Sequence, residues 1–284
     1  MSNIVIPYRG LLTQLGDGPY VPPSGNLIGD WNPLATNVTK ATVGNEEFVS
    51  RWDNSTNGRY MDQSSASARP TWHDGSGIGD IGKPYLRFNE NATGLSSGVT
   101  WLELDTDFYA HTQVMTFYFV MDPTGDPDTY INWIGNSLDY DYDEGWRLGT
   151  DSSSEEMEAG VGNWPQNSFT LKSNWTSRRV VCYKFYRTSN ESLRANRGGY
   201  TFGNDPVIWT SDTSYYNWNV SFQGFNQASN VHSVVCGTGR NGSGNIPYYG
   251  SDFNMYRWLV YDTYHNDSTS EDIMVALKQE YSTL

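Results

Sequence analysis

Basic residues are scarce in this sequence. Its 284 residues include 18 lysines and arginines against 32 aspartates and glutamates, which gives a formal net charge of −14. A nucleic-acid interface needs clustered cations to displace counterions from phosphates, and an anionic membrane surface attracts similar clusters. The one notable basic pair is Arg178 and Arg179. We therefore expect neither a nucleic acid nor a membrane as partner.

Long apolar runs are also missing. The most apolar stretch covers residues 114–121, which is far below the roughly 20 residues that a membrane-spanning helix needs. The first residues, Met1, Ser2 and Asn3, do not begin a basic segment followed by an apolar one. We expect no membrane span and no signal peptide.

Cysteine occurs twice, at Cys182 and Cys236, and each follows two valines in an apolar run. Two cysteines in a chain of this length do not make a disulfide framework. The pattern favours two buried free thiols. A disulfide stays the alternative if the two strands are neighbours.

Aromatic residues are abundant at 15%, and they occur among many glycines, asparagines, serines and threonines. This composition is typical of strands and turns. Short apolar or alternating segments are separated by turn residues, and they lie at residues 85–88, 114–121, 130–135, 145–149, 179–186, 231–236 and 255–261. The pattern predicts an all-β fold, with one antiparallel β-sandwich over residues 27–284.

The two ends of the chain differ from this pattern. Residues 16–25 read GDGPYVPPSG, which is loop chemistry, so we expect an extended N-terminal arm over residues 1–26. Such an arm either reaches onto a neighbouring subunit or is a loose terminus. At the other end, Ile273, Leu277 and Tyr281 recur at helical spacing after the capping hydroxyls of residues 268–270. This stripe predicts one C-terminal helix that docks on the sandwich.

Several strings resemble the laminin-G-like branch of the concanavalin A-like superfamily. Residues 51–58 read RWDNSTNG and resemble its W-x-D-x-S-x-N-G segment, and residues 82–88 read GKPYLRF and resemble its G-x-P-x-L-R-F strand. Residues 69–71, 114–121 and 255–262 follow the family's order. The resemblance implies a two-sheet antiparallel jelly roll. It does not select one activity, because members include sugar binders, adhesion modules, glycosidases, polysaccharide lyases and virion surface proteins.

Two acidic patterns are candidates for chemistry. Glu103, Asp105 and Asp107 alternate as E-x-D-x-D, whereas some relatives use E-x-D-x-E for glycoside hydrolysis. Because the last glutamate is replaced, a solvated strand end is the preferred interpretation, and we expect no catalytic residue. A second cluster contains Asp139, Asp141 and Asp143, whose oxygens suit calcium, although the EF-hand pattern fails. The sequence thus predicts no cofactor, with calcium as the alternative.

Two aromatic loops are better candidates for binding. They place rings beside amides, and the candidate residues are Tyr215, Tyr216, Trp218, Tyr248 and Tyr249. A flat ring suits the apolar face of a sugar, and rings with polar tips also suit protein interfaces. The alternative is that these rings fold onto the sandwich.

Four features together favour a non-catalytic structural or binding protein: a sandwich in one chain, no signal peptide, an N-terminal arm and an acidic surface. The leading hypothesis is a virion surface protein of the bacteriophage capsid decoration or fibre type. It would bind capsid proteins, or itself as a homo-oligomer through the arm, and a surface glycan as a further partner. The second hypothesis is a carbohydrate-binding or adhesion module, located extracellularly or at a cell surface. A glycosidase or polysaccharide lyase is the third.

Overall fold

The structure is a computed structural model that describes part of the chain. The described residues are 20–77, 80–90, 98–105, 114–123, 131–135, 146–151, 156–161, 178–189, 192–201, 233–240, 245–247, 250 and 252–281. The strands are β1 (Leu27–Trp31), β2 (Val38–Val43), β3 (Glu46–Asp53), β4 (Tyr60–Asp62), β5 (Thr71–His73), β6 (Tyr85–Phe88), β7 (Leu102–Leu104), β8 (Val114–Pro123), β9 (Ile131–Gly135), β10 (Trp146–Asp151), β11 (Glu156–Val161), β12 (Arg179–Ser189), β13 (Ser192–Thr201), β14 (Val235–Cys236) and β15 (Phe253–Tyr261). One 3-10 turn, η1 (Ala66–Ala68), and one helix, α1 (Asp267–Glu280), complete the described elements. The predicted all-β fold with a C-terminal helix is confirmed.

The two layers of the sandwich are continuous through β3. The strand order is β11-β10-β9-β14-β7-β4-β3-β5-β6-β15-β8-β12-β13, with β1 on β15 and β2 on β3. The beginning of β3 pairs with β5, where Phe48 faces Thr71, and its end pairs with β4, where Arg51 faces Asp62. We call β4, β7, β14, β9, β10 and β11 the first layer. The second layer consists of β5, β6, β15, β8, β12 and β13 with β1.

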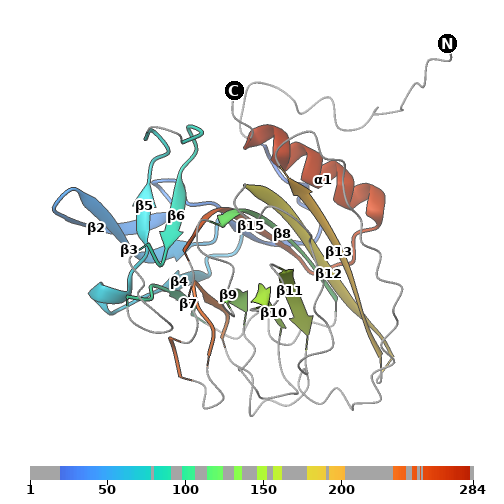
Figure 1. Ribbon diagram of the computed structural model, residues 1–284. Helices are drawn as coiled ribbons and strands as arrows, with labels where there is room; N and C mark the ends of the chain where they lie inside the picture. Colours follow the sequence, from blue (N-terminus) through green and yellow to red (C-terminus); the bar gives the residue numbers. More distant parts are fainter. Residues whose placement is uncertain are drawn as a thin grey trace.

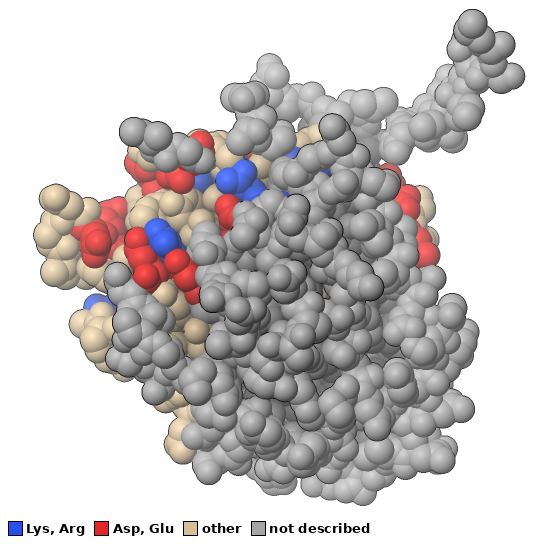
Figure 2. Space-filling view, in the orientation of Figure 1, with Lys and Arg blue, Asp and Glu red and all other residues tan. Residues whose placement is uncertain are grey.

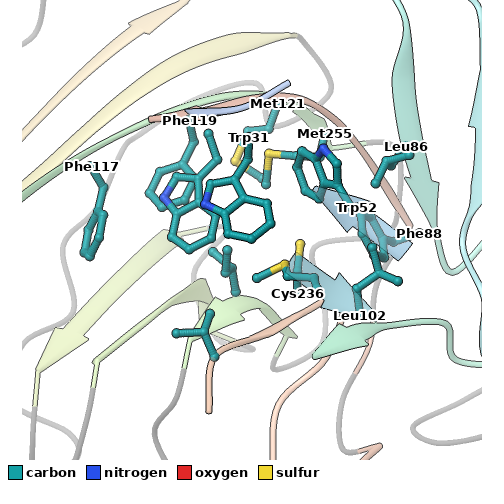
Figure 3. Packing of buried hydrophobic residues seen from close by; sticks show 14 of the residues in the cluster. Trp31, Trp52, Leu86, Phe88, Leu102, Phe117, Phe119, Met121, Cys236 and Met255 are labelled. Atoms are coloured by element: carbon teal, nitrogen blue, oxygen red, sulfur yellow. The ribbon is translucent and has the colours of Figure 1, made fainter. Parts of the chain in front are cut away.

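An aromatic core fills the space between the layers. Trp31 stacks on Trp258 with ring centroids 5.7 Å apart, and it meets Trp52 edge-on at 5.6 Å. Phe119 stacks on the other side of Trp258 at 5.8 Å. Figure 3 shows Trp31, Trp52 and Phe119 together with other side chains of this core, including Leu102 of β7. Close-packed rings of this kind contribute apolar burial and favourable ring–ring geometry.

A second cluster lies on the other side of the second layer, beneath α1 (Figure 1). In β8, alternate residues divide between the two cores: Phe117 and Phe119 face the first, whereas Tyr118 and Val120 face the helix. This explains why the run 114–121 is apolar on both faces, as predicted. The predicted helical stripe is also buried, since Ile273, Leu277 and Tyr281 are at most 2% exposed and belong to this cluster.

The helix N-cap lies two residues before the first of the predicted hydroxyl caps, Ser268. Asn266 is the N-cap, and its side chain accepts a hydrogen bond from the backbone N–H of Thr269 at 2.9 Å. Ser270 is instead fully buried and accepts a hydrogen bond from the Tyr118 hydroxyl at 3.3 Å. The hydroxyl thus serves the packing of the helix on β8, while the asparagine satisfies the orphan N–H.

The last residues of the predicted arm pack on the sandwich. Pro22 is buried, and the Tyr20 carbonyl accepts a hydrogen bond from Arg257 Nη1 at 3.1 Å. The guanidinium of Arg257 also binds both oxygens of Asp30, at 2.9 and 2.8 Å, and Glu280 at 2.9 Å. Burial by itself lowers the pKa of Arg257, but the hydrogen bonds to Asp30 keep that pKa above its ordinary value. Residues 1–19 of the predicted arm lie outside the described residues.

Both cysteines are free and buried, as predicted. Cys182 lies in the cluster beneath α1, whereas Cys236 lies in the core between the layers, so their strands are not neighbours. Burial raises the pKa of the Cys236 thiol, which keeps it protonated and unreactive. Among the described helical residues, none forms a helix long and apolar enough to cross a bilayer.

The segment 51–58, noted for its family resemblance, has a structural role. Asn54 is buried, and its side-chain oxygen accepts from the backbone N–H of Asp30 at 3.0 Å and of Thr56 at 3.0 Å. Asn57 donates to the Ile28 carbonyl at 2.7 Å. These bonds tie the turn between β3 and β4 to β1, so the asparagines hold the layers in place.

Candidate functional site

A row of outward-facing residues crosses four strands at the end of the second layer that lies beyond α1. The register pairs Ala41 of β2 with Phe48 of β3, Phe48 with Thr71 of β5, and Thr71 with Arg87 of β6. The residues next to them on β5 and β6, Trp72 and Leu86, pack on the opposite side against the main core. Because side chains alternate along strands, the four residues share one face.

This row forms the floor of a groove of about 410 Å³. The other lining residues belong to η1 and to the segments that connect the strands, or lie at a strand end. The groove is lined by Ala41, Val43, Phe48, Ala66, Ser67, Arg69, Thr71, Arg87, Glu90, Gly98 and Thr100. Its volume lies within the range of about 300–1,000 Å³ for small-molecule sites. Hereafter "the groove" means this set of residues.

One wall of the groove is fixed by Asn89, which follows β6 and adopts a φ of 62°. Its backbone N–H donates to Thr100 Oγ1 at 2.8 Å, and its side-chain oxygen accepts from the Thr100 backbone N–H at 2.7 Å. Its side-chain amide donates to the Gly237 carbonyl at 2.7 Å. Gly237 has a φ of 106°, and a Cβ there would lie 2.4 Å from the Thr100 carbonyl oxygen. Glycine is therefore required for this close approach.

Arg87 is held at the floor by two carboxylates. Its Nε and Nη2 donate to Asp252 at 3.1 and 2.8 Å, and its Nη1 donates to Glu90 at 2.7 Å. The hydrogen bonds to Asp252 raise the pKa of Arg87. The guanidinium is thus fixed in orientation, and Glu90 is held at the rim with an oxygen available to a ligand.

A smaller acidic hollow of about 290 Å³ adjoins the groove and shares Thr71 and Glu90 with it. It is lined by Asn45, Glu46, Glu47, Thr71, Trp72, His73, Asp74 and Glu90. Hydrogen bonds from Ser76 lower the pKa of Asp74, so that this carboxyl stays ionised. Within it, Glu47 pairs with Lys40 at 2.7 Å, and the ring of His73 stacks on Tyr85 at 4.6 Å.

Together the two hollows combine an apolar floor with fixed polar groups. Phe48, Ala41 and the 66%-exposed Val43 offer apolar surface, while hydroxyl, carboxylate and guanidinium groups surround it. Figure 2 shows the described surface from one side, where basic and acidic side chains lie next to one another. Such an arrangement suits a ligand with both apolar faces and many hydroxyls. Among the described residues, no group of three or more His, Cys, Asp or Glu could hold a metal ion.

The predicted binding and calcium residues belong to segments outside the described part of the chain. The aromatic candidates Tyr215, Tyr216, Trp218, Tyr248 and Tyr249, and the calcium candidates Asp139, Asp141 and Asp143, all lie outside the described residues. One end of the second aromatic loop is described at Gly250. A Cβ there would lie 2.7 Å from Val99 and 3.0 Å from Asn89, beside the groove wall. Gly250 therefore lies next to Asn89, the residue that fixes one wall of the groove.

The predicted carboxylate pattern falls on the opposite layer and is not simply a solvated strand end. Glu103 lies within β7, directly opposite Asp62 of β4, and its side chain is 39% exposed. Its Oε1 accepts hydrogen bonds from Ser233 and from Arg240, whose side chain is 8% exposed. A guanidinium is a hydrogen-bond donor only, so the Glu103 carboxylate is the acceptor in this ion pair. Asp105 follows β7 and lies 3.9 Å from Arg59, while Asp107 lies outside the described residues.

The groove residues were not predicted from the sequence, because they come from segments far apart in the chain. Phe48, Thr71 and Arg87 meet only through strand register. The signal that was available is Arg87, a charged residue between the buried Leu86 and Phe88. In a strand, this pattern marks a side chain that faces away from the core.

The comparisons with known proteins concern the fold. No protein-family model matches the sequence, and no curated protein matches it significantly. An arabinofuranosidase complexed with arabinofuranosyl-alpha-1,2-xylobiose superposes with a TM-score of 0.51 at 11% identity, over 83% of this chain and 52% of that one. A Trypanosoma rangeli sialidase gives a TM-score of 0.47 at 13% identity, over 96% of this chain and 38% of that one. The CBM40 domain of a Ruminococcus gnavus sialidase, bound to alpha2,3 sialyllactose, gives 0.40 at 12% identity, over 68% of this chain and 97% of that one.

The likeness to the arabinofuranosidase, at 11% identity, concerns the sandwich fold and establishes no activity. The chain spans little more than a third of the sialidase and about half of the arabinofuranosidase. The predicted bacteriophage origin gains no support from them and stays a prediction.

Proposed function

We propose that this chain is a non-catalytic carbohydrate-binding β-sandwich whose binding site is the groove. The observation that carries the proposal is the floor formed by Ala41, Phe48, Thr71 and Arg87, with hydroxyl and charged groups around it. A sugar ring has an apolar face for the Phe48 ring and hydroxyls for the surrounding donors and acceptors. Because these groups lie on paired strands, the site is formed before the ligand arrives.

The likeness to a solved structure makes a glycan the first ligand class to test. The arabinofuranosidase that shares the sandwich is complexed with arabinofuranosyl-alpha-1,2-xylobiose. This supports the second hypothesis drawn from the sequence more than the first. The virion surface role, with assembly through residues 1–26, stays a prediction because residues 1–19 lie outside the described part of the chain.

A glycan screen with the variant Phe48→Ala tests the proposal. Phe48 is half-buried, so we expect the variant to fold, and loss of the ring should weaken binding by about tenfold to a hundredfold. Glu103→Gln, on the other layer, is the matched control and should bind like the unaltered chain. Unchanged binding by Phe48→Ala would assign recognition to another surface, and Trp218→Ala in the same screen tests the predicted aromatic loop.

The hydrolase alternative is tested with the same proteins. Glu103, with Asp62 opposite, is the described residue on which a hydrolase would depend. We expect no release of reducing sugar from any glycan that binds. Release that disappears in Glu103→Gln would contradict the non-catalytic proposal and place the reaction on the first layer.

A further inference from the structure

Arg69 differs from the other arginines whose side chains the structure describes in its lack of a carboxylate partner. The other six each have a carboxylate within 4.0 Å: Arg51, Arg59, Arg87, Arg178, Arg240 and Arg257. Arg69 has no carboxylate partner among the described residues. In a chain with 32 acidic residues against 18 basic ones, an arginine that lacks an acidic partner is unexpected. Its side chain lines the groove.

The position of this guanidinium is fixed by the backbone. Its Nε donates to the Gln63 carbonyl at 3.0 Å, and its Nη2 donates to the Ser64 carbonyl at 3.1 Å. The following residue is anchored to β3, where the Pro70 carbonyl accepts from the Val49 N–H at 2.9 Å. Carbonyls are neutral, so these bonds orient the group, and no carboxylate of the described residues compensates its positive charge.

The two carbonyls occupy one edge of the guanidinium. Arginine has five N–H donors, and the bonds from Nε and Nη2 use two of them, on the side edge. The end of the fork, formed by Nη1 and the remaining N–H of Nη2, keeps its donors. Two parallel N–H groups match a carboxylate in bidentate geometry.

We propose that Arg69 receives the carboxylate of an acidic sugar, so that the groove selects glycans that carry a single acid at this end. The inference rests on the proposed function and names its ligand class. The adjoining acidic hollow determines which end of the ligand carries the acid and which end is neutral. Four carboxylates line it: Glu47 is paired with Lys40 and Glu90 with Arg87, whereas Glu46 and Asp74 have no cationic partner within 4.0 Å among the described residues. Carboxylates without a cationic partner accept bonds from neutral hydroxyls but repel a second acid. A neutral sugar therefore occupies the acidic hollow, and a chain of consecutive uronic acids is disfavoured.

The test compares matched ligands on the intact chain. Oligosaccharides that end in a hexuronic acid or a nonulosonic acid are titrated beside their carboxyl-reduced counterparts and sulfated counterparts. We expect the acid to bind about tenfold or more tightly than the reduced form, with the preference falling as salt is raised. The two kinds of acid distinguish the sources of the carboxylate.

Variants assign this preference to a residue. Arg69→Gln should remove the preference for the acid, and Arg69→Lys should retain part of it, because lysine keeps the charge but not the fork. Arg51→Gln is the control, since Arg51 pairs with Asp53 and does not line the groove. Thermal unfolding of each variant verifies that it is folded.

Each outcome decides the inference. Equal binding of acid and reduced forms, or a preference that survives Arg69→Gln, overturns it while glycan binding that depends on Phe48 still stands. Equal binding of sulfated and carboxylated sugars overturns the carboxylate assignment in favour of a general anion site. Binding of no glycan at all rejects the proposed function together with this inference.

Discussion

The outer face of the second layer is covered by α1 in one region and left uncovered in another. Under α1, outward residues such as Tyr118, Val120 and Leu259 are at most 1% exposed and form a second core. Beyond the helix, Thr71 of β5 and Arg87 of β6 face outward and line the groove, whereas Tyr85 of β6 still belongs to the second core. The backbone pairing is the same in both regions. What differs is whether another element covers the face, because only uncovered positions can keep polar groups for a ligand.

The two arginines of this face make the comparison concrete. Arg257 and Arg87 each bind two carboxylates through short hydrogen bonds. The side chain of Arg257 is 4% exposed, whereas that of Arg87 is 28% exposed. Arg257 is therefore part of the folded structure beneath the helix, whereas Arg87 is partly exposed at the groove, where a ligand can contact it.

The largest expected effect comes from replacing these arginines in turn. Arg257→Met strands the carboxylates of Asp30 and Glu280 in a buried site, and should lower the free energy of unfolding by about 3–5 kcal/mol. Arg87→Met removes a partly solvated pair and should cost about 1 kcal/mol or less. Urea unfolding of both variants measures the difference, and equal losses would refute the distinction between the two regions.

A pair of apolar truncations sharpens the same comparison. Leu277→Ala, at a fully buried position of α1, should destabilise the fold by about 2–5 kcal/mol. Val43→Ala, at a position that is 66% exposed on the groove, should change stability by no more than about 0.5 kcal/mol. Thermal unfolding records both effects. A large loss for Val43→Ala would mean that the groove end is also part of the stabilising core.

The smallest effect is a dependence on alkaline pH that originates under the helix. Burial raises the pKa of Tyr118, Tyr261 and Tyr281 above the ordinary value of 10.0. In the unfolded chain these tyrosines ionise near pH 10, while in the folded chain they stay neutral. Their contribution to stability is therefore complete below pH 10 and is lost as the pH rises above it.

Removing one hydroxyl isolates this contribution. Tyr281→Phe should make the fall in stability above pH 10 shallower by about 1.4 kcal/mol per pH unit. The half-exposed Tyr60, changed to Phe, is the control. Urea midpoints between pH 8 and 11.5 provide the measurement, and identical slopes for both variants would show that the tyrosines beneath α1 do not carry the effect.

Structural features that depend on a local sequence pattern were predicted correctly. The doubly apolar run 114–121 became β8, and the spacing of Ile273, Leu277 and Tyr281 identified the face of α1 that is buried. Local periodicity reports which face of an element is apolar, because it depends on geometry within one segment. The predicted start of the helix was wrong, because Asn266 and the hydroxyl residues 268–270 are all of types that cap helices. In the folded chain Ser270 is buried against Tyr118, so it does not cap the helix.

The site could not be predicted in the same way. Glu103 was interpreted as part of a solvated strand end, because the sequence does not show that Arg240 lies against it. Phe48, Thr71 and Arg87 come from three strands, and the register that aligns them is a property of the assembled sheet.

The sequence by itself determined a β-sandwich with an acidic surface and one closing helix, because apolar periodicity and turn residues are properties of short, continuous segments. The tertiary structure alone decided which outward face stays uncovered, which carboxylates are neutralised, and that Arg69 keeps its charge without an acidic partner among the described residues. Those outcomes depend on distances between residues remote in the chain, and one-dimensional patterns do not contain such distances.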